Sequence, residues 1–268
     1  MKACLKRFYV ALILMFLYTP IVLLIVFSFN ASKSRAVWEG FTLDWYRELF
    51  ADRKIIAALQ NTLSIGLIAA AVSTLVGTLA AIGLYQIKKG PRAALMALCN
   101  LPMLNSEIVT GVSLMLLYTA MNMELGYLTL LLSHVAFCIP YVVLSVLPKL
   151  RQLDPHLAEA AQDLGATPLQ AFFKVILPDI MPGVFSGFLL ALTMSIDDFV
   201  ISFFTTGMGV QNLSITIYTM AKRGISPKIN ALSTLIFLTV LALLVIVNLP
   251  EFIDKDKKDR KTGRVRAA

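Results

Sequence analysis

Three acidic side chains lie in or beside strongly apolar stretches of this sequence: Glu107, Asp197 and Asp198. A carboxylate at the centre of a membrane helix costs about 2.5 to 3.5 kcal/mol, so such residues normally face a polar interior. Glu107 follows Pro102, which lacks a backbone N–H and can interrupt a membrane helix. Because the apolar stretches offer no obvious Lys or Arg partner, the three carboxylates predict a pathway for a polycation rather than for sulfate, molybdate or phosphate.

The two neighbouring aspartates leave other roles open. Adjacent residues on a helix point about 100° apart, so Asp197 and Asp198 cannot line the same stripe of a pore. We expect one of them to face the solute pathway and the other to face a neighbouring helix. Either one can instead cap a kinked helix or bond another subunit.

The histidines and cysteines form no recognisable catalytic or metal-binding pattern. His134 and His156 belong to neither an HExxH motif nor a nucleophile triad, and the three cysteines have no metal-ligand spacing. The phosphate-binding pattern GxxxxGK[ST] does not occur in the chain. We therefore expect a protein that is not an enzyme and holds no metal, so that any ATP is hydrolysed elsewhere. We interpret His134 as a hydrogen-bond partner between helices.

The elements that carry these residues are predicted to be membrane helices. Of the 268 residues, 58% are hydrophobic and 15% are charged, whereas soluble domains are about half apolar and a quarter charged. A helix needs about 20 apolar residues to cross a bilayer. We predict an all-α integral membrane protein with six transmembrane helices, at residues 8–29, 59–84, 95–121, 125–147, 183–206 and 231–249. We interpret the first as a retained span rather than a cleaved signal.

Two features of these segments predict how they pack. On the second span, Gly66, Gly77 and Gly83 are expected to let neighbouring helices approach closely. Between the first two spans, the loop at residues 30–53 carries aromatic side chains among its charges, and aromatic rings favour the membrane interface. We therefore expect an ordered external segment there, with the aromatic residues Trp38, Phe41, Trp45 and Tyr46.

Positive charge predicts the orientation of the chain. An even number of spans leaves both termini on one side, and that side holds twice as many Lys and Arg residues as the other. By the positive-inside rule both termini are cytoplasmic. The net charge of +8 is spread over loops and the tail rather than one face, which argues against nucleic acid as a partner. We divide the chain into a first span with its external loop (1–58), a membrane core (59–250) and a charged cytoplasmic tail (251–268).

The connection between the fourth and fifth spans carries strong local signals. Asp154 can accept from free N–H groups at a helix start while Pro155 occupies the first turn, and Gly165 is expected to end that helix. Thr167 and Gln170 have the spacing of a capping box, so a second helix is expected to begin at once.

This second helix is expected to run toward Val175 and to be stopped by Pro178 and Pro182. The two short helices predict a compact elbow over residues 153–178. Glu159 and Asp163 lie one turn apart on it. Such an elbow suits the groove of a partner protein, although the same pattern also fits a simple amphipathic connector.

The elbow carries a resemblance to a known family. Glu159-Ala160-Ala161, then Gly165, then Ile176-Leu177-Pro178 resemble the EAA motif of binding-protein-dependent ABC importer permeases. The resemblance implies the MetI-like fold of type I ABC importers. It also implies that the elbow is the coupling helix, which sits in a cleft of an ATPase subunit. The residues that would couple to the ATPase are Glu159, Ala160, Ala161, Asp163 and Gly165, and ATP with Mg would be bound by that ATPase.

Shorter segments outside the elbow narrow the resemblance. They are Ser28-Phe29-Asn30, Trp38 to Tyr46, Ser133-His134, Phe137 to Pro140, Ser195 to Asp198, and Ser226-Pro227 with Asn230-Ala231. Together they resemble the C-type permease subunits of spermidine/putrescine importers, from the first span to the sixth. The resemblance implies a bacterial cytoplasmic membrane, an ATPase subunit dimer, a second permease subunit and an extracytoplasmic polyamine-binding protein.

Two rival functions remain open. The nearer is an ABC permease for another solute, such as an amino acid, thiamine or ferric ion. The farther is a membrane sensor or assembly subunit without transport, which would need a loop or tail domain large enough to signal. The sequence offers no such domain.

Overall fold

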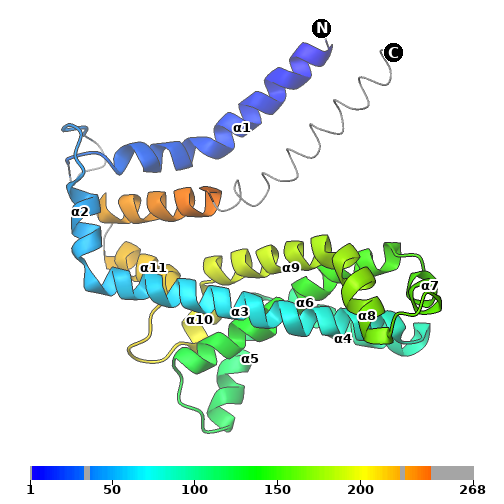
Figure 1. Cartoon of the computed structure of the whole chain (residues 1–268). Coiled ribbons are helices and arrows are strands. Elements are labelled where there is room, and N and C mark those ends of the chain that lie inside the picture. The colour runs from blue at the N-terminus through cyan, green and yellow to red at the C-terminus, as the bar shows by residue number, and fades with distance from the viewer. Residues whose placement is uncertain (1, 33–36, 224–226, 243–268) are drawn as a thin grey trace. The chain divides into compact units, whose positions relative to one another are not determined.

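The computed structural model describes residues 2–32, 37–223 and 227–242, and the regular secondary structure in these ranges is helical (Figure 1). Four described helices are long and apolar enough to cross a membrane, and a bent pair of helices can supply a fifth span. The predicted all-α membrane class is therefore confirmed. The chain divides into two compact units, Met1–Arg53 with Thr219–Ala268 and Lys54–Tyr218.

The first unit contains α1 (Lys2–Phe27), α2 (Asp44–Ala51) and the helix Pro227–Ala242. After Arg7, the segment of α1 that runs to Phe27 is apolar on all sides, as expected of a helix that meets lipid. Lys228, in the first turn of the last helix, forms an ion pair with Glu48 of α2 at 3.3 Å. The sixth predicted span, 231–249, is helical as far as residue 242, and its remainder lies outside the described residues.

The loop after α1 is organised by one buried side chain, Asn30. Its Oδ1 accepts hydrogen bonds from the backbone N–H groups of Ser32 and Glu39, and its Nδ2 donates to the Val37 carbonyl. The Trp45 indole donates to the Asn30 carbonyl at 2.7 Å. The expected order of this aromatic segment is confirmed over residues 37–53.

The second unit holds most of the remaining helices. They are α3 (Arg53–Gln86), α4 (Lys89–Leu104), α5 (Glu107–Ala120), α6 (Tyr127–Gln152), α7 (Leu157–Asp163), α8 (Pro168–Ala171), a π-helix (Phe172–Ile176), α9 (Leu177–Asp197), α10 (Val200–Thr205) and the first turns of α11 (Leu213–Arg223). Helix α6 packs along α9, and α10 packs against α5 and α6 (Figure 1).

Glycines on α3 let this helix approach α6 and α9 closely. A Cβ atom on Gly77 would lie 2.7 Å from the Cβ of Val142 on α6, and one on Gly66 would lie 3.1 Å from Ile196 on α9. Real Cβ atoms do not come as close as 2.7 Å, so a side chain at position 77 would force the helices apart. The close-packing prediction is confirmed for these two positions and wrong for Gly83, which faces open space.

Two of the six predicted spans are not single helices. The predicted helix at 95–121 is divided into α4 and α5, which are bent by 103° where Asn105 and Ser106 adopt extended backbone. The predicted helix at 183–206 ends at Asp197, and Asp198 is extended with ψ 128° before α10 begins. Apolar composition indicates how long a span is. It does not reveal a break in the helix, because backbone groups at a break can find hydrogen-bond partners inside the protein.

Candidate functional site

The predicted elbow is present, and its first half is built as the sequence indicates. Asp154 Oδ1 accepts a hydrogen bond from the backbone N–H of His156 at the start of α7. Gly165 ends the helix in a left-handed conformation with φ +87°, which glycine adopts at little cost. Its N–H donates to the Gln162 carbonyl, and the next N–H donates to the Ala161 carbonyl, which forms a Schellman motif.

The second half of the elbow departs from the prediction at its end. The capping box of Thr167 and Gln170 is present, with both hydrogen bonds formed. Pro178 and Pro182 do not stop the helix, because a π-turn over Phe172–Ile176 precedes them and the chain runs on helically to Asp197. In the π-turn, the N–H of Leu177 donates five residues back to Phe172, and this wider turn precedes the proline whose N–H is missing.

The elbow is exposed along α7 and over α8 apart from Ala171. None of the α7 side chains is buried, and Glu159, Ala160, Asp163 and Gly165 are exposed while Ala161 is partly covered. Leu164 is 90% exposed and Leu169 is 70% exposed. Two exposed leucines beside two carboxylates are typical of a surface that a partner protein covers.

His156 and Glu159 interact on this exposed surface. His156 Nδ1 lies 3.1 Å from Glu159 Oε2. This hydrogen bond, together with the negative charges of Glu159 and Asp154, raises the pKa of His156 above its ordinary value of 6.5. The imidazole is therefore more easily protonated than a free histidine, and its charge offsets part of the acidity of the elbow.

A second polar cluster is buried where α9 breaks into α10, and Asp198 is its centre. Asp198 Oδ1 accepts from the N–H of Ile201, and Oδ2 accepts from both the N–H and the hydroxyl of Ser202 at 2.8 Å. The carboxylate thus caps α10, whose first N–H groups would otherwise lack partners. Only 8% of Asp198 is exposed.

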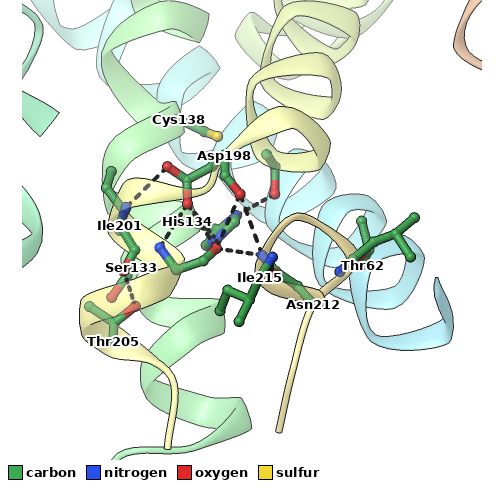
Figure 2. A network of polar contacts seen from close by, with 12 residues as sticks. Thr62, Ser133, His134, Cys138, Asp198, Ile201, Thr205, Asn212 and Ile215 are labelled. Carbon is green, nitrogen blue, oxygen red and sulfur yellow. Dashed lines mark hydrogen bonds and ion pairs between the residues drawn. The ribbon is translucent and has the colours of Figure 1, made fainter. Parts of the chain in front are cut away.

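His134 of α6 joins the two sides of this break (Figure 2). Its Nδ1 lies 2.6 Å from the Ser195 hydroxyl, and its Nε2 lies 3.0 Å from the Ser202 hydroxyl. Because the single hydroxyl proton of Ser202 goes to Asp198, Nε2 of His134 donates to Ser202, and in the neutral imidazole Nδ1 then accepts from Ser195. The interpretation of His134 as an interhelical hydrogen-bond partner is confirmed.

Asn212 extends the cluster to α11 and α3 (Figure 2). Its Nδ2 donates to the Ser202 hydroxyl at 2.6 Å, while its Oδ1 accepts from the N–H of Ile215 and so caps α11. The neighbouring N–H of Leu213 donates to the Thr62 hydroxyl of α3 at 2.7 Å. We call Asp198, His134, Ser195, Ser202 and Asn212 the buried network. It ties α6, α9, α10 and α11 together.

The other two candidate acids lie apart from the buried network. Asp197 is exposed although its neighbour is buried, so the two aspartates diverge, and Glu107 is exposed at the first residue of α5. Glu107 begins a helix directly after a break, which confirms the predicted broken helix beside a carboxylate. Within the described ranges no hydrogen bond or ion pair holds either carboxylate. A role in the solute pathway stays a prediction for all three acids.

Several residues of the buried network were not singled out from the sequence. Ser202 and Asn212 of the network, and Thr62 beside it, are short polar residues in apolar surroundings, and each type is common on protein surfaces. One signal was available, because Asn212 precedes an apolar helical segment and asparagine is a favoured N-cap. Across the described residues, no three His, Cys, Asp or Glu side chains gather closely enough to hold a metal ion.

Comparisons with known proteins point in one direction. Residues 1–255 match the family described as "Binding-protein-dependent transport system inner membrane component". The chain is 38% identical over 251 residues to the spermidine/putrescine transport system permease protein PotC of Escherichia coli (strain K12), covering 94% of each chain. It is 40% identical over 228 residues to the putrescine transport system permease protein PotI of the same strain, covering 82% of this chain and 81% of PotI.

A solved structure shares the fold. A chain of a bacterial ABC transporter involved in the import of the acidic polysaccharide alginate superposes with a TM-score of 0.71 at 19% identity, covering 95% of this chain and 94% of that one. At this identity the likeness concerns the fold alone. It is the fold of an ABC importer permease.

Proposed function

The chain belongs to the family of binding-protein-dependent transport system inner membrane components, and we propose that it is the permease subunit through which an ATP-driven importer moves spermidine or putrescine. The 38% identity to a spermidine/putrescine permease over 94% of both chains carries this proposal. A permease subunit moves its solute without chemical change, so the chain is not an enzyme. It is a multi-pass protein of the cytoplasmic membrane, and we assign both termini to the cytoplasmic side.

The elbow is the surface that we assign to an ATPase subunit. Its exposed leucines, Leu164 and Leu169, offer apolar area to a groove, and Glu159 and Asp163 offer charge to basic residues at the rim. The ATPase dimer would bind ATP and Mg. A second permease subunit and an extracytoplasmic polyamine-binding protein complete the proposed importer.

The helix that follows the elbow can carry movement of the elbow to other helices. The chain is helical without interruption over Pro168–Asp197, which is 30 residues and about 45 Å of helix. It ends at Asp197, and the buried network holds the break at Asp198. Closure of the ATPase dimer would therefore displace α9 as a unit, and the break would transmit that displacement to α10 and α11.

The exposed carboxylates suit the proposed solute. Asp197 and Glu107 are exposed, and no described partner neutralises either one. A polyamine carries several positive charges, so transient contact with such carboxylates would favour its passage over that of an anion. Both carboxylate oxygens of Asp198 already accept hydrogen bonds, and we assign Asp198 to holding the break.

Uptake by the reconstituted complex tests this function. The complex is assembled in vesicles with its ATPase, its second permease and its binding protein, and ATP-dependent uptake of labelled spermidine and putrescine is measured. Saturable uptake by wild type is expected, with a loss of at least fivefold in Asp197→Asn or Glu107→Gln. Glu124→Gln is the matched control, because it removes an exposed carboxylate from the loop before α6.

The outcomes separate the importer from its substrate. An assembled complex that hydrolyses ATP but takes up neither polyamine would overturn the polyamine assignment and keep the importer. If both acid variants take up polyamine as wild type does, the polyamine assignment stands. Asp197 and Glu107 would then not belong to the solute pathway.

A further inference from the structure

Two guanidinium groups meet in a hollow at the end of the second unit that carries the elbow. Arg92 lies in the first turns of α4, and Arg151 is the penultimate residue of α6. They line a hollow of about 440 Å³ together with Ala93 and Met96. Helices α4 and α6 pack against each other.

The positive charge in this hollow is not neutralised by the part of the chain that the structure describes. There, neither guanidinium forms an ion pair with a carboxylate. The Nε of Arg92 is shielded from solvent and has no hydrogen-bond partner among the described atoms. Buried polar nitrogens rarely stay without a partner in folded proteins, so the unmatched donor points to a missing acceptor.

The helix dipole accounts for only one of the two arginines. Arg151 lies in the last turn of α6, where a positive charge is favourable. Arg92 lies near the beginning of α4, where the dipole is already positive and the first turn contains no acidic residue. A positive charge there is unfavourable until an anion joins it.

We propose that the hollow binds the phosphate group of an anionic membrane lipid. A guanidinium presents its N–H groups in a fork that fits phosphate oxygens, and two such groups supply two positive charges. Basic pockets between membrane helices are known to hold lipid headgroups. Met96 lines the hollow, and Leu95, three residues after Arg92 and so on a neighbouring part of the helix surface, is 41% exposed and offers apolar area to an acyl chain.

The lipid would act as a bridge between two helices. Its phosphate would join the start of α4 to the end of α6, and four residues separate that end from the elbow helix α7. Anionic lipid should therefore stabilise the end of the unit from which the elbow leaves. Free inorganic phosphate shares the headgroup chemistry but lacks the acyl chains, so the two sources can be told apart.

Native mass spectrometry of the purified full chain in detergent tests the site. Phosphatidylglycerol, phosphatidylcholine with the same acyl chains, and sodium phosphate are titrated separately. We expect one phosphatidylglycerol to bind wild type at least tenfold more tightly than phosphatidylcholine, with sodium phosphate a poor competitor. The double variant Arg92→Gln/Arg151→Gln should lose at least tenfold in phosphatidylglycerol affinity, while Arg53→Gln, which removes an exposed arginine at the start of α3, should not.

A charge-preserving variant guards against a folding defect. Arg92→Lys/Arg151→Lys keeps both charges but not the guanidinium fork, and should bind about threefold more weakly than wild type. Equal affinity in wild type and the double Gln variant would overturn the proposal. Strong competition by sodium phosphate would replace the lipid with a free phosphate. Loss of lipid binding on addition of the ATPase, together with loss of ATPase binding in the Gln variant, would identify the hollow as a protein interface instead.

Discussion

The buried network and the elbow lie in the same unit, but they differ in where their polar groups find partners. In the network, the carboxylate of Asp198 has its acceptors filled by Ile201 and Ser202 of the same chain. On the elbow, Glu159 and Asp163 face outward beside a leucine that is 90% exposed. The difference teaches that the chain completes one region by itself and leaves the other to be completed by a partner. Substitutions in the first should therefore affect stability, and substitutions in the second should affect assembly.

The sharpest test of this contrast compares the two adjacent aspartates. Asp198→Ala leaves the N–H groups at the start of α10 and the Ser202 hydroxyl without their acceptor. We expect the free energy of unfolding in mild detergent to fall by about 2 to 3 kcal/mol. Asp197→Ala removes the same charge from an exposed position and should change it by less than about 0.5 kcal/mol. Equal losses in the two variants would contradict the description of the network as self-contained.

The elbow should show the opposite behaviour. Leu164→Ala removes exposed apolar area, so the free energy of unfolding should stay unchanged. Affinity for the ATPase subunit should fall about tenfold, which is about 1.4 kcal/mol. Titration of purified ATPase against immobilised complex measures the affinity. Leu43→Ala, an exposed leucine outside the elbow, is the control, and a similar loss in that variant would remove the special role of Leu164.

A smaller effect is expected at the glycine that ends α7. Gly165→Ala places a Cβ at φ +87°, which costs about 1 kcal/mol in a left-handed conformation. Amide hydrogen exchange in the elbow should accelerate about fivefold, while exchange in α6 and α9 stays the same. Gly83→Ala, in a helical position with open space, should not accelerate exchange. Unchanged exchange in the elbow of Gly165→Ala would show that the left-handed turn is not required.

The smallest effect is a pH dependence confined to the elbow. The pKa of His156 is raised in the folded chain, so its contact with Glu159 contributes fully below the ordinary pKa of 6.5 and is lost as pH rises through the raised value. NMR titration of the imidazole should show the raised pKa, and Glu159→Gln should return it toward 6.5. A His156 pKa at or below 6.5 would argue against the contact.

Local sequence signals predicted the elbow almost residue by residue. The capping box at Thr167 and the glycine at position 165 each act through neighbours within a few positions, so no distant part of the chain is needed to fix them. The π-turn escaped prediction because it depends on how the chain accommodates Pro178 within a continuous helix. Pro178 was expected to end the helix, but the helix widens into a π-turn before it and continues.

The buried network could be predicted only in part. Asp198 and His134 were conspicuous because ionisable residues are rare in apolar segments. Their partners were not, since Ser202 and Asn212 acquire their roles from the break after Asp197, which brings α10 and α11 against α6. The break in the fifth span likewise depends on tertiary hydrogen bonds. Length and hydropathy therefore located the apolar segments but did not show where their helices break.

The π-turn over Phe172–Ile176 also sets the direction in which the elbow leaves the helix. A π-turn is in effect an α-helix with one residue inserted, and one residue corresponds to about 100° of rotation and 1.5 Å of rise. Removing a single residue there would let α8 and α9 join as one regular helix. The elbow would then point about 100° away from its present direction, although every contact within it could persist. The direction of the elbow thus depends on the number of residues in this turn rather than on side-chain contacts.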